Sequence, residues 1–227
     1  MPTEISLVDY YARRANEYER IYSKPERQAD LCVLRQWLRD KCAGHHVLEV
    51  ACGTGYWTEA IASTASTVTA VDLNQEVLEI ARKKNFPRRN VSFEKQDAYQ
   101  LSFSSNPFNV GLAMFWWSHV PKSKLTQFLR RFHQALPPDA LLLFADNRYV
   151  EGSSTPISRR DEEGNTYQLR SLADGSQYEV LKNFPTESEL RTTLHGFGNH
   201  LTYTSLDFYW TIEERAATTL VQHISKS

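Results

Sequence analysis

The sequence predicts a single α/β domain built on a mostly parallel sheet with helices on both faces. Two observations lead to this prediction. Short apolar runs alternate with longer amphipathic segments, and the run at 140–145 is apolar throughout, as a parallel strand covered on both faces must be. The length of 227 residues fits one such domain with an added segment and argues against a second full domain. We divide the chain into an N-terminal helical cap at 1–44, a core at 45–149, an insertion at 150–184, and a C-terminal helix with the last strands at 185–227.

The N-terminal cap is expected to contain two helices. Between Leu7 and Tyr22, five residues with apolar bodies recur at spacings of three or four, which is one face of a helix, and three of the five are tyrosines. The stretch 23–26, Ser-Lys-Pro-Glu, has the form of a capping box, so a second helix is predicted to start there and to end at Gly44. Arg27, near the start of that helix, is expected to be solvated at the surface, and the alternative is that it reaches the carboxylate of a bound cofactor.

Residues 46–72 have the pattern of a strand, a glycine turn, a helix and a second strand. The first strand is predicted at 47–51, the turn at 52–55, the helix at 56–65 and the second strand at 67–71. Glycines in the turn tolerate positive φ and let a ligand come close to the backbone. This is the outline of half of a nucleotide-binding βαβ unit.

Three acids stand at or near the carboxyl ends of predicted strands. Glu49 lies inside the first strand, just before the turn, Asp72 follows the second, and Asp97 follows a third strand at 91–96. A dinucleotide fingerprint requires a third glycine at position 58, where this sequence has Thr58. Carboxylates suit a ligand with hydroxyls and a cationic group better than a ligand with two phosphates. The pattern therefore favours a cofactor other than a dinucleotide.

These motifs resemble those of the class I S-adenosylmethionine-dependent methyltransferases of the small-molecule type. The resemblance runs from about Val47 to Asn147 and rests on VLEVACGTG at 47–55, AVD at 70–72, QDAYQL at 96–101 and LPPDALLLFADN at 136–147. It implies a Rossmann-like seven-stranded sheet of order 3-2-1-4-5-7-6 with an N-terminal helical cap. It also implies that the cofactor is S-adenosyl-L-methionine. The stretch 150–184 departs from the minimal core of that family, and we expect it to be a β-hairpin insertion after strand 5.

The resemblance further implies roles for individual residues. Gly53 and Gly55 would pack against the methionine part, Asp72 would accept hydrogen bonds from the ribose hydroxyls, and Asp97 with Ala98 would flank the adenine. Glu49 would fix the glycine loop or meet the cofactor ammonium through water. In the family an N-terminal helix lies over the cofactor, although an ordinary amphipathic cap helix is the alternative, and Arg13 or Arg14 would pair the methionine carboxylate. The expected cofactor-binding residues are Tyr11, Arg13, Tyr18, Glu49, Ala51, Gly53, Gly55, Asp72, Leu73, Asp97, Ala98 and Phe115.

A methyl acceptor is expected beyond the fourth predicted strand, 108–115, where the chain continues as Trp116-Trp117-Ser118-His119. Aromatic rings there would exclude water or attract a cationic methyl group, although one of the two tryptophans is expected only to cover the sheet. His119 is the candidate catalytic general base, because an ordinary histidine has a pKa near about 6.5. Pocket lining and helix capping are its alternative roles.

The insertion is expected to select the acceptor, because it lies at the active end of the sheet. It contains a predicted hairpin that pairs 166–172 with 177–181. An anion-binding or polar acceptor pocket is one interpretation of its side chains, and salt-bridged loop arginines are the other. The candidate substrate residues are Trp116, Trp117, Asn147, Tyr149 and Arg159, with Arg148, Tyr167 and Arg170 as further members of that pocket.

The last part of the chain is predicted less completely. Thr186-Glu187-Ser188-Glu189 is a capping box that starts a short helix ended by Gly196. The stretch 203–212 has the composition of one strand or two, and the tail from Glu213 is expected to be helical. His133, on a helix at 125–136, is expected at the surface.

Charge and composition limit the partners. Lysine plus arginine number 26 against 27 acids, so the net charge of −1 argues against nucleic acid or an anionic membrane as a partner. The sequence contains no apolar run of about 20 residues and no signal-peptide pattern, so we expect a cytoplasmic protein. The three cysteines suggest neither a disulfide framework nor a zinc site, and no metal motif is visible. The oligomeric state is left open.

The sequence thus predicts methyl transfer from S-adenosylmethionine to an oxygen or nitrogen of a small-molecule acceptor by in-line displacement. Three alternatives remain at this stage: a catalytically silent S-adenosylmethionine-binding module, an NAD-dependent oxidoreductase, and a methyltransferase acting on tRNA or protein.

Overall fold

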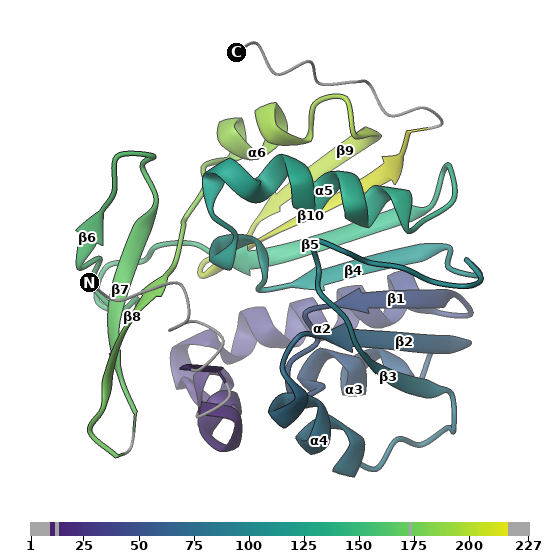
Figure 1. Ribbon diagram of the computed structural model, residues 1–227, viewed down its shortest axis with the longest axis horizontal. Coiled ribbons are helices and arrows are strands. Elements are labelled where there is room, and N and C mark those ends of the chain that lie inside the picture. The colour runs from purple at the N-terminus through teal and green to yellow at the C-terminus, as the bar shows by residue number, and fades with distance from the viewer. Residues whose placement is uncertain (1–9, 12–13, 173, 218–227) are drawn as a thin grey trace.

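A computed structural model describes residues 10–11, 14–172 and 174–217. Its main sheet has seven strands in the order β3-β2-β1-β4-β5-β10-β9 (Figure 1). The first five are parallel, whereas β10 runs antiparallel to both β5 and β9. This confirms the predicted order, with β9 and β10 as the two strands that could not be placed from the sequence. The strands are β1 His46–Val50, β2 Thr67–Asp72, β3 Val91–Lys95, β4 Val110–Met114, β5 Leu141–Asn147, β9 Gly198–Ser205 and β10 Tyr209–Ala216.

Helices cover both faces of this sheet. Side chains alternate along β1, so Val47 belongs to a cluster that includes Leu34 of α2 and Ile61 of α3. Leu48 belongs to a second cluster, on the other face, that includes Phe128 of α5 and Leu190 of α6. Two hydrophobic clusters result, one on each side of the sheet, as the apolar runs predicted. The α-helices are α2 Gln28–Cys42, α3 Tyr56–Ala62, α4 Gln75–Lys83, α5 Leu125–Gln134 and α6 Glu187–Leu194, and the 3₁₀ helices are η1 Ala15–Ser23, η2 Pro25–Arg27, η3 Trp117–His119 and η4 Lys122–Lys124.

The insertion after β5 forms a separate three-stranded sheet, β6 Arg159–Arg160, β7 Thr166–Ser171 and β8 Gln177–Leu181. The predicted hairpin is confirmed, with Tyr167 opposite Leu181 and Ser171 opposite Gln177. In Figure 1 this sheet stands at the left, beyond one end of the long strands. Because β5 leads into the insertion, this is the end at which the parallel strands finish.

Two expectations for the helix starts have opposite outcomes. The capping box at Thr186 is confirmed, since its side chain accepts a hydrogen bond from the Glu189 amide and the Glu189 carboxylate accepts one from the Thr186 amide. The box expected at Ser23 does not form. The Ser23 hydroxyl instead donates to the carbonyl of Arg20 in the preceding turn, and α2 begins only at Gln28, after a short 3₁₀ helix.

Two predictions about the C-terminal half are wrong. Residues from Glu213 to Ala216 belong to β10 and are not helical, because they pair with β5 and β9, and residues after 217 lie outside the described part of the chain. His133 is only 3% exposed. Its Nδ1 donates to the Leu129 carbonyl and its Nε2 lies 2.9 Å from the Glu214 carboxylate, so a long-range partner on β10 holds it inside.

None of the described helices has the length and apolar character needed to cross a membrane.

Candidate active site

A cavity of about 320 Å³ lies at the carboxyl ends of β1, β2 and β4. Its size is in the range of small-molecule sites, which begin at about 300 Å³. Most of the residues expected to bind a cofactor line this one space, although they come from five separate segments. The predicted residues that line it are Tyr11, Ala51, Gly53, Asp72, Leu73, Asp97, Ala98, Phe115, Trp116 and His119.

Asp72 fixes the glycine turn to the end of β2. Its Oδ2 accepts a hydrogen bond from the Gly53 amide and its Oδ1 accepts one from the Asn74 amide, both at 2.9 Å. Burial raises the pKa of Asp72 above its ordinary value, and these two amide donors oppose the rise. The carboxylate therefore positions the backbone of the turn while it remains on the cavity wall, where ligand hydroxyls can reach it.

Another part of the lining of this cavity combines a carboxylate with aromatic and apolar groups. Asp97 is oriented by the Tyr99 amide, which donates to its Oδ1 at 2.8 Å. The buried Nε1 of Trp116 has no hydrogen-bond partner among the described residues, so this wall carries a donor that a ligand acceptor would satisfy. A flat heteroaromatic base with ring nitrogens and an exocyclic amine fits these groups.

The backbone is strained at two points of the same cavity. Ala51, directly after β1, has φ 55°, and Phe115, directly after β4, has φ 58°. Left-handed backbone at residues other than glycine costs about 1–3 kcal/mol and is concentrated at functional sites. Both residues line the cavity, so the strain shapes the turns that bound it.

Glu49 and Gly55 take supporting positions behind the turn and do not line the cavity. Glu49 is 1% exposed, and its Oε2 accepts a hydrogen bond from the Thr58 hydroxyl at 2.5 Å. Burial raises its pKa to about 8, against the opposing effect of that hydrogen bond. Gly55 has φ 76°, and a Cβ there would lie 3.1 Å from the Cβ of Ala81 in α4. Of the two roles expected for Glu49, the geometry fits the fixing of the glycine loop.

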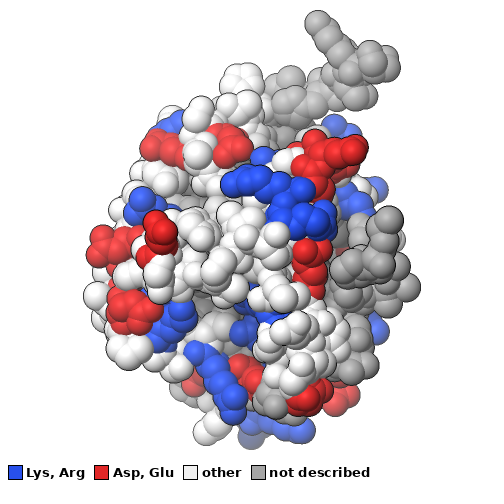
Figure 2. Space-filling model, turned by 90° about the vertical axis from the view of Figure 1, so that its left-hand side faces the viewer, with Lys and Arg blue, Asp and Glu red and all other residues white. Residues whose placement is uncertain are grey.

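A second cavity, of about 410 Å³, adjoins the first. Tyr11, Phe115 and His119 line both cavities and therefore form the boundary between them. The second cavity lies under η1 and η2 and against β7 and β8, on the side of the molecule shown in Figure 2. Lysine and arginine atoms are visible inside a hollow on that face.

His119 is held in one orientation at this boundary. Its Nδ1 lies 2.7 Å from the Leu181 carbonyl, which only accepts, so Nδ1 carries the proton and Nε2 accepts from the Tyr11 hydroxyl at 2.9 Å. Burial and then the positive charge of Lys182 hold the pKa of His119 well below its ordinary value, although Asp146 opposes them. The imidazole is therefore neutral near neutral pH, with its basic nitrogen on the side of the two cavities.

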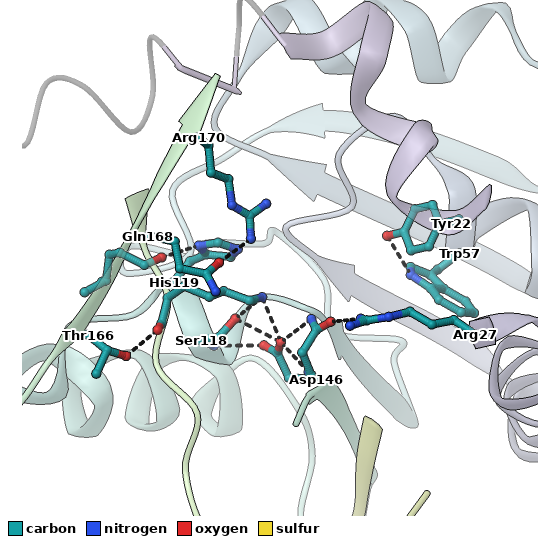
Figure 3. Close-up of polar contacts among 12 residues, drawn as sticks. Tyr22, Arg27, Trp57, Ser118, His119, Asp146, Thr166, Gln168 and Arg170 are labelled. Carbon is teal, nitrogen blue, oxygen red and sulfur yellow. Dashed lines mark hydrogen bonds and ion pairs between the residues drawn. The ribbon is translucent and has the colours of Figure 1, made fainter. Parts of the chain in front are cut away.

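A buried ion pair supports the floor of the second cavity. The Lys182 ammonium donates to the Asp146 carboxylate at 3.1 Å and to the Ser118 hydroxyl at 2.6 Å. Burial alone would raise the pKa of Asp146, but Lys182 and His119 outweigh it and hold this pKa low. Asn147 links this group to Arg27, whose Nη1 donates to the Asn147 side-chain oxygen at 3.0 Å (Figure 3).

Arg27 corrects the expectation of a solvated side chain. It is 6% exposed, and its guanidinium donates to the Ser153 hydroxyl and lies over the rings of Phe208 and Tyr209. In Figure 3 it extends toward Asp146 from one side, while Arg170 lies above His119.

Three predicted substrate residues lie elsewhere. Trp117 packs edge-on against Phe144 and Trp210 in the core, as expected for one tryptophan of the pair. Tyr149 packs against Phe184 and lines a different cavity. Arg159 is exposed and bound to Glu179 at 2.8 Å, which is the alternative interpretation of a salt-bridged loop arginine. Arg13 lies outside the described residues, as does the side chain of Tyr18.

Sequence reasoning missed Asp146 and Lys182 altogether. Asp146 follows the apolar run of β5 just as Asp72 follows β2, so its position at a strand end was an available signal. Lys182 had no such signal, because its partner lies 36 residues away and only the folded insertion brings the two together.

Residues 47–139 match the family described as "Methyltransferase domain". Over this stretch, which is less than half of the chain, the sequence is similar to the class I S-adenosylmethionine-dependent methyltransferases. The stretch that matches includes the glycine turn, Asp72, Asp97 and His119, but it ends before β5 and the insertion. The family match therefore covers the first cavity much better than the second.

Individual methyltransferases are less than 30% identical to this chain. The demethylmenaquinone methyltransferase of Staphylococcus aureus (strain MRSA252) is 29% identical over 103 residues, which are 44% of this chain and 42% of that protein. The chain thus matches less than half the length of the curated relatives. Among solved structures, the DhpI complex with SAH and the DhpI–SAM–HEP complex are both 24% identical to this chain, with TM-scores of 0.73 and 0.76. The two matches cover 96% and 94% of this chain and 100% and 99% of those chains. A methyltransferase of Aquifex aeolicus has a TM-score of 0.63 at 15% identity and covers 91% of this chain and 98% of its own. At these identities the structures establish the shared fold.

Proposed function

We propose that this chain binds S-adenosylmethionine in the first cavity and transfers its methyl group to an oxygen or nitrogen of a small molecule in the second. The cofactor, when bound, supplies a methyl group on a positively charged sulfur. Asp72 and Asp97 would hold its ribose and adenine, and the glycine turn would lie against its methionine part. The matched family and the acids at the strand ends support the choice of cofactor.

The observation that carries the proposal is the shared boundary of the two cavities. Tyr11, Phe115 and His119 line both spaces, so a donor in one and an acceptor in the other would meet there. Methyl transfer requires the acceptor atom in line with the breaking bond, at about 3–3.5 Å, and most of the rate gain comes from that positioning. Two adjoining cavities with a common wall provide such an arrangement.

The Tyr11–His119 pair gives the boundary a proton acceptor. His119 is neutral, and its Nδ1–H is fixed by the Leu181 carbonyl, so Nε2, which accepts a hydrogen bond from the Tyr11 hydroxyl, is the ring nitrogen that can gain a proton. When the acceptor is a hydroxyl or ammonium group, its proton would pass to Nε2 directly or through the Tyr11 hydroxyl. An acceptor that has already lost its proton needs no such step.

Two measurements test the proposal. Calorimetry with S-adenosylhomocysteine is expected to give a single site per chain, and NAD is expected not to bind, because Thr58 occupies the third glycine position and is bonded to Glu49. A screen of small metabolites with S-adenosylhomocysteine release as the readout is expected to yield at least one acceptor. Binding of NAD in place of S-adenosylhomocysteine would overturn the proposal, and cofactor binding with no turnover on small molecules, tRNA or protein would reduce the chain to a binding module.

A further inference from the structure

The second cavity carries an excess of positive charge. Of the described residues that line it, six are lysines or arginines and one, Glu17, is an acid. The carboxylates beside it neutralise only part of that charge, because Glu17 pairs with Arg20 at 3.5 Å, Glu26 pairs with Lys24 at 4.0 Å and Asp146 pairs with Lys182 at 3.1 Å. The six cations are Arg14, Arg20, Lys24, Arg27, Arg170 and Lys182.

Arg27 and Arg170 have no carboxylate partner within the described chain. Arg27 donates to the neutral side chains of Ser153, Asn147 and Tyr209. Arg170 donates to the Gln168 side-chain oxygen at 2.6 Å, and its buried Nε has no hydrogen-bond partner among the described residues. A buried donor left unpaired costs about 1–3 kcal/mol, and a guanidinium matches the two oxygens of an oxyanion. The orphaned Nε therefore indicates a missing acceptor on the cavity side.

The positive charges of these side chains affect one another's pKa values. Burial lowers the pKa of Lys182 to about 8, with Arg170 and Arg27 adding to the lowering and Asp146 opposing it. The pKa of Lys24 is also lowered, by burial and by Arg27. Like charges gathered in a partly desolvated space repel one another, and an anion placed among them removes that repulsion.

The cofactor itself does not supply the missing charge. S-adenosylmethionine carries a sulfonium and an ammonium against one carboxylate, so a filled first cavity makes the neighbouring space more positive. Its one carboxylate cannot neutralise both Arg27 and Arg170, which have no carboxylate partner among the described residues. Charge complementarity therefore calls for a negative group on the acceptor.

We propose that the second cavity selects a small acid as the methyl acceptor, with a carboxylate or phosphate-type oxyanion held by Arg27, Arg170 and Lys182. This inference rests on the proposed function. The oxyanion anchors one end of the acceptor, and the reacting atom then lies at the wall made by Tyr11, Phe115 and His119. The bidentate fork of Arg170 also fixes the orientation of the acid, which in-line transfer requires.

The test titrates the full chain, saturated with S-adenosylhomocysteine, with inorganic phosphate, acetate and uncharged acetamide in separate calorimetric experiments. At least one of the two anions is expected to bind and acetamide is not. Arg170→Gln is expected to weaken anion binding at least tenfold and Arg170→Lys to weaken it less. Arg191→Gln is the matched control, because Arg191 is exposed and paired with Glu187 on α6, and it should bind as the wild type does. Tighter binding of acetate would assign a carboxylic acid, and tighter binding of phosphate would assign a phosphate or phosphonate group.

Three results would overturn the inference. The first is that neither anion binds the loaded wild type, and the second is that Arg170→Gln binds the anion as tightly as the wild type does. The third is that Arg170→Gln weakens the binding of S-adenosylhomocysteine by the same factor as the binding of the anion, which would assign Arg170 to the cofactor carboxylate. Because Arg170 is only half-buried, the variants are expected to fold, and the unfolding temperature of each is measured first. A wild type that fails to bind S-adenosylhomocysteine refutes the proposed function instead, and the phosphate titration of the unloaded chain still tests the anion site.

Discussion

Replacing Glu49 with glutamine is expected to stabilise the folded chain at alkaline pH. Glu49 is enclosed behind the glycine turn, where burial raises its pKa from 4.5 to about 8. The folded chain therefore keeps this proton at neutral pH, whereas the unfolded chain loses it near about pH 4.5. Glutamine has nearly the same shape as the protonated acid, and its side-chain oxygen accepts the hydrogen bond from the Thr58 hydroxyl.

The magnitude follows from the difference in bound protons. Because the folded pKa of Glu49 is the higher one, its contribution to stability is complete below about pH 4.5 and is lost as the pH rises to about 8, at about 1.4 kcal/mol per pH unit. From pH 5 to pH 8 the free energy of unfolding of the wild type therefore falls by about 4 kcal/mol through this one group. Glu49→Gln does not titrate, so its stability relative to the wild type rises by that amount over the same interval.

Urea unfolding at pH 5, 6, 7 and 8, followed by tryptophan fluorescence, measures this difference. Glu94→Gln is the control, because Glu94 is exposed on β3 and its removal should leave the pH dependence of the wild type unchanged. If Glu49→Gln and the wild type keep a constant difference from pH 5 to pH 8, Glu49 is ionised in the folded chain and its interpretation as a neutral support of the turn fails.

Three other substitutions test the boundary and the cofactor wall. Asp72→Ala is expected to weaken S-adenosylhomocysteine binding by about 1.5–3 kcal/mol, or roughly 10- to 150-fold, because the Gly53 amide loses a charged acceptor; unchanged affinity in calorimetry would contradict the role of Asp72. His119→Ala is expected to lower kcat about 100-fold with cofactor affinity retained, and an effect confined to the acceptor KM would make His119 a wall residue. Because burial and Lys182 hold the pKa of His119 well below its ordinary value, acidification through the range in which an ordinary histidine titrates, near about pH 6.5, should not lower the wild-type kcat through this group; a fall centred there would argue against it. Tyr11→Phe keeps the ring and removes the hydroxyl that donates to His119, so kcat should fall less than in His119→Ala, and a larger fall would give the hydroxyl a role of its own.

The first cavity was largely predictable because its residues occupy equivalent places in a repeated unit. Parallel strands end at one edge, so a residue that follows a strand points toward the same space as the residue that follows the next. Asp72, Asp97 and Phe115 each follow a strand in this way, and all three line one cavity. Gly55 was also expected to line the cavity, but it packs against Ala81 of α4. The neighbours of a glycine in the sequence do not show which helix it will face.

The errors concern residues whose partners are distant in the chain. Arg27 lies in a charged stretch typical of an exposed helix start, yet Asn147 and Ser153 bind its side chain inside the fold. His133 lies on a helix whose polar residues are mostly exposed, yet Glu214 on β10, 81 residues later, binds its ring. A polar residue is buried when a partner satisfies it, and periodicity carries no information about such a partner.

For the same reason, the residues around the first cavity could be predicted from the sequence better than those around the second. The second cavity is bounded by η1 and η2, by the segment after β5 and by the β7–β8 hairpin, and only its boundary with the first cavity falls within the stretch matched by the family. The aromatic turn after β4 contributes less to it than its sequence suggests, since Trp117 is packed in the core and Trp116 faces the first cavity. All three segments bring hydrogen-bond donors to this space, and the helical segment and the hairpin also bring cations, among them Arg27, Arg170 and Lys182. A comparison of acids with their neutral isosteres, at constant shape, therefore tests acceptor recognition more directly than a comparison of aromatic acceptors.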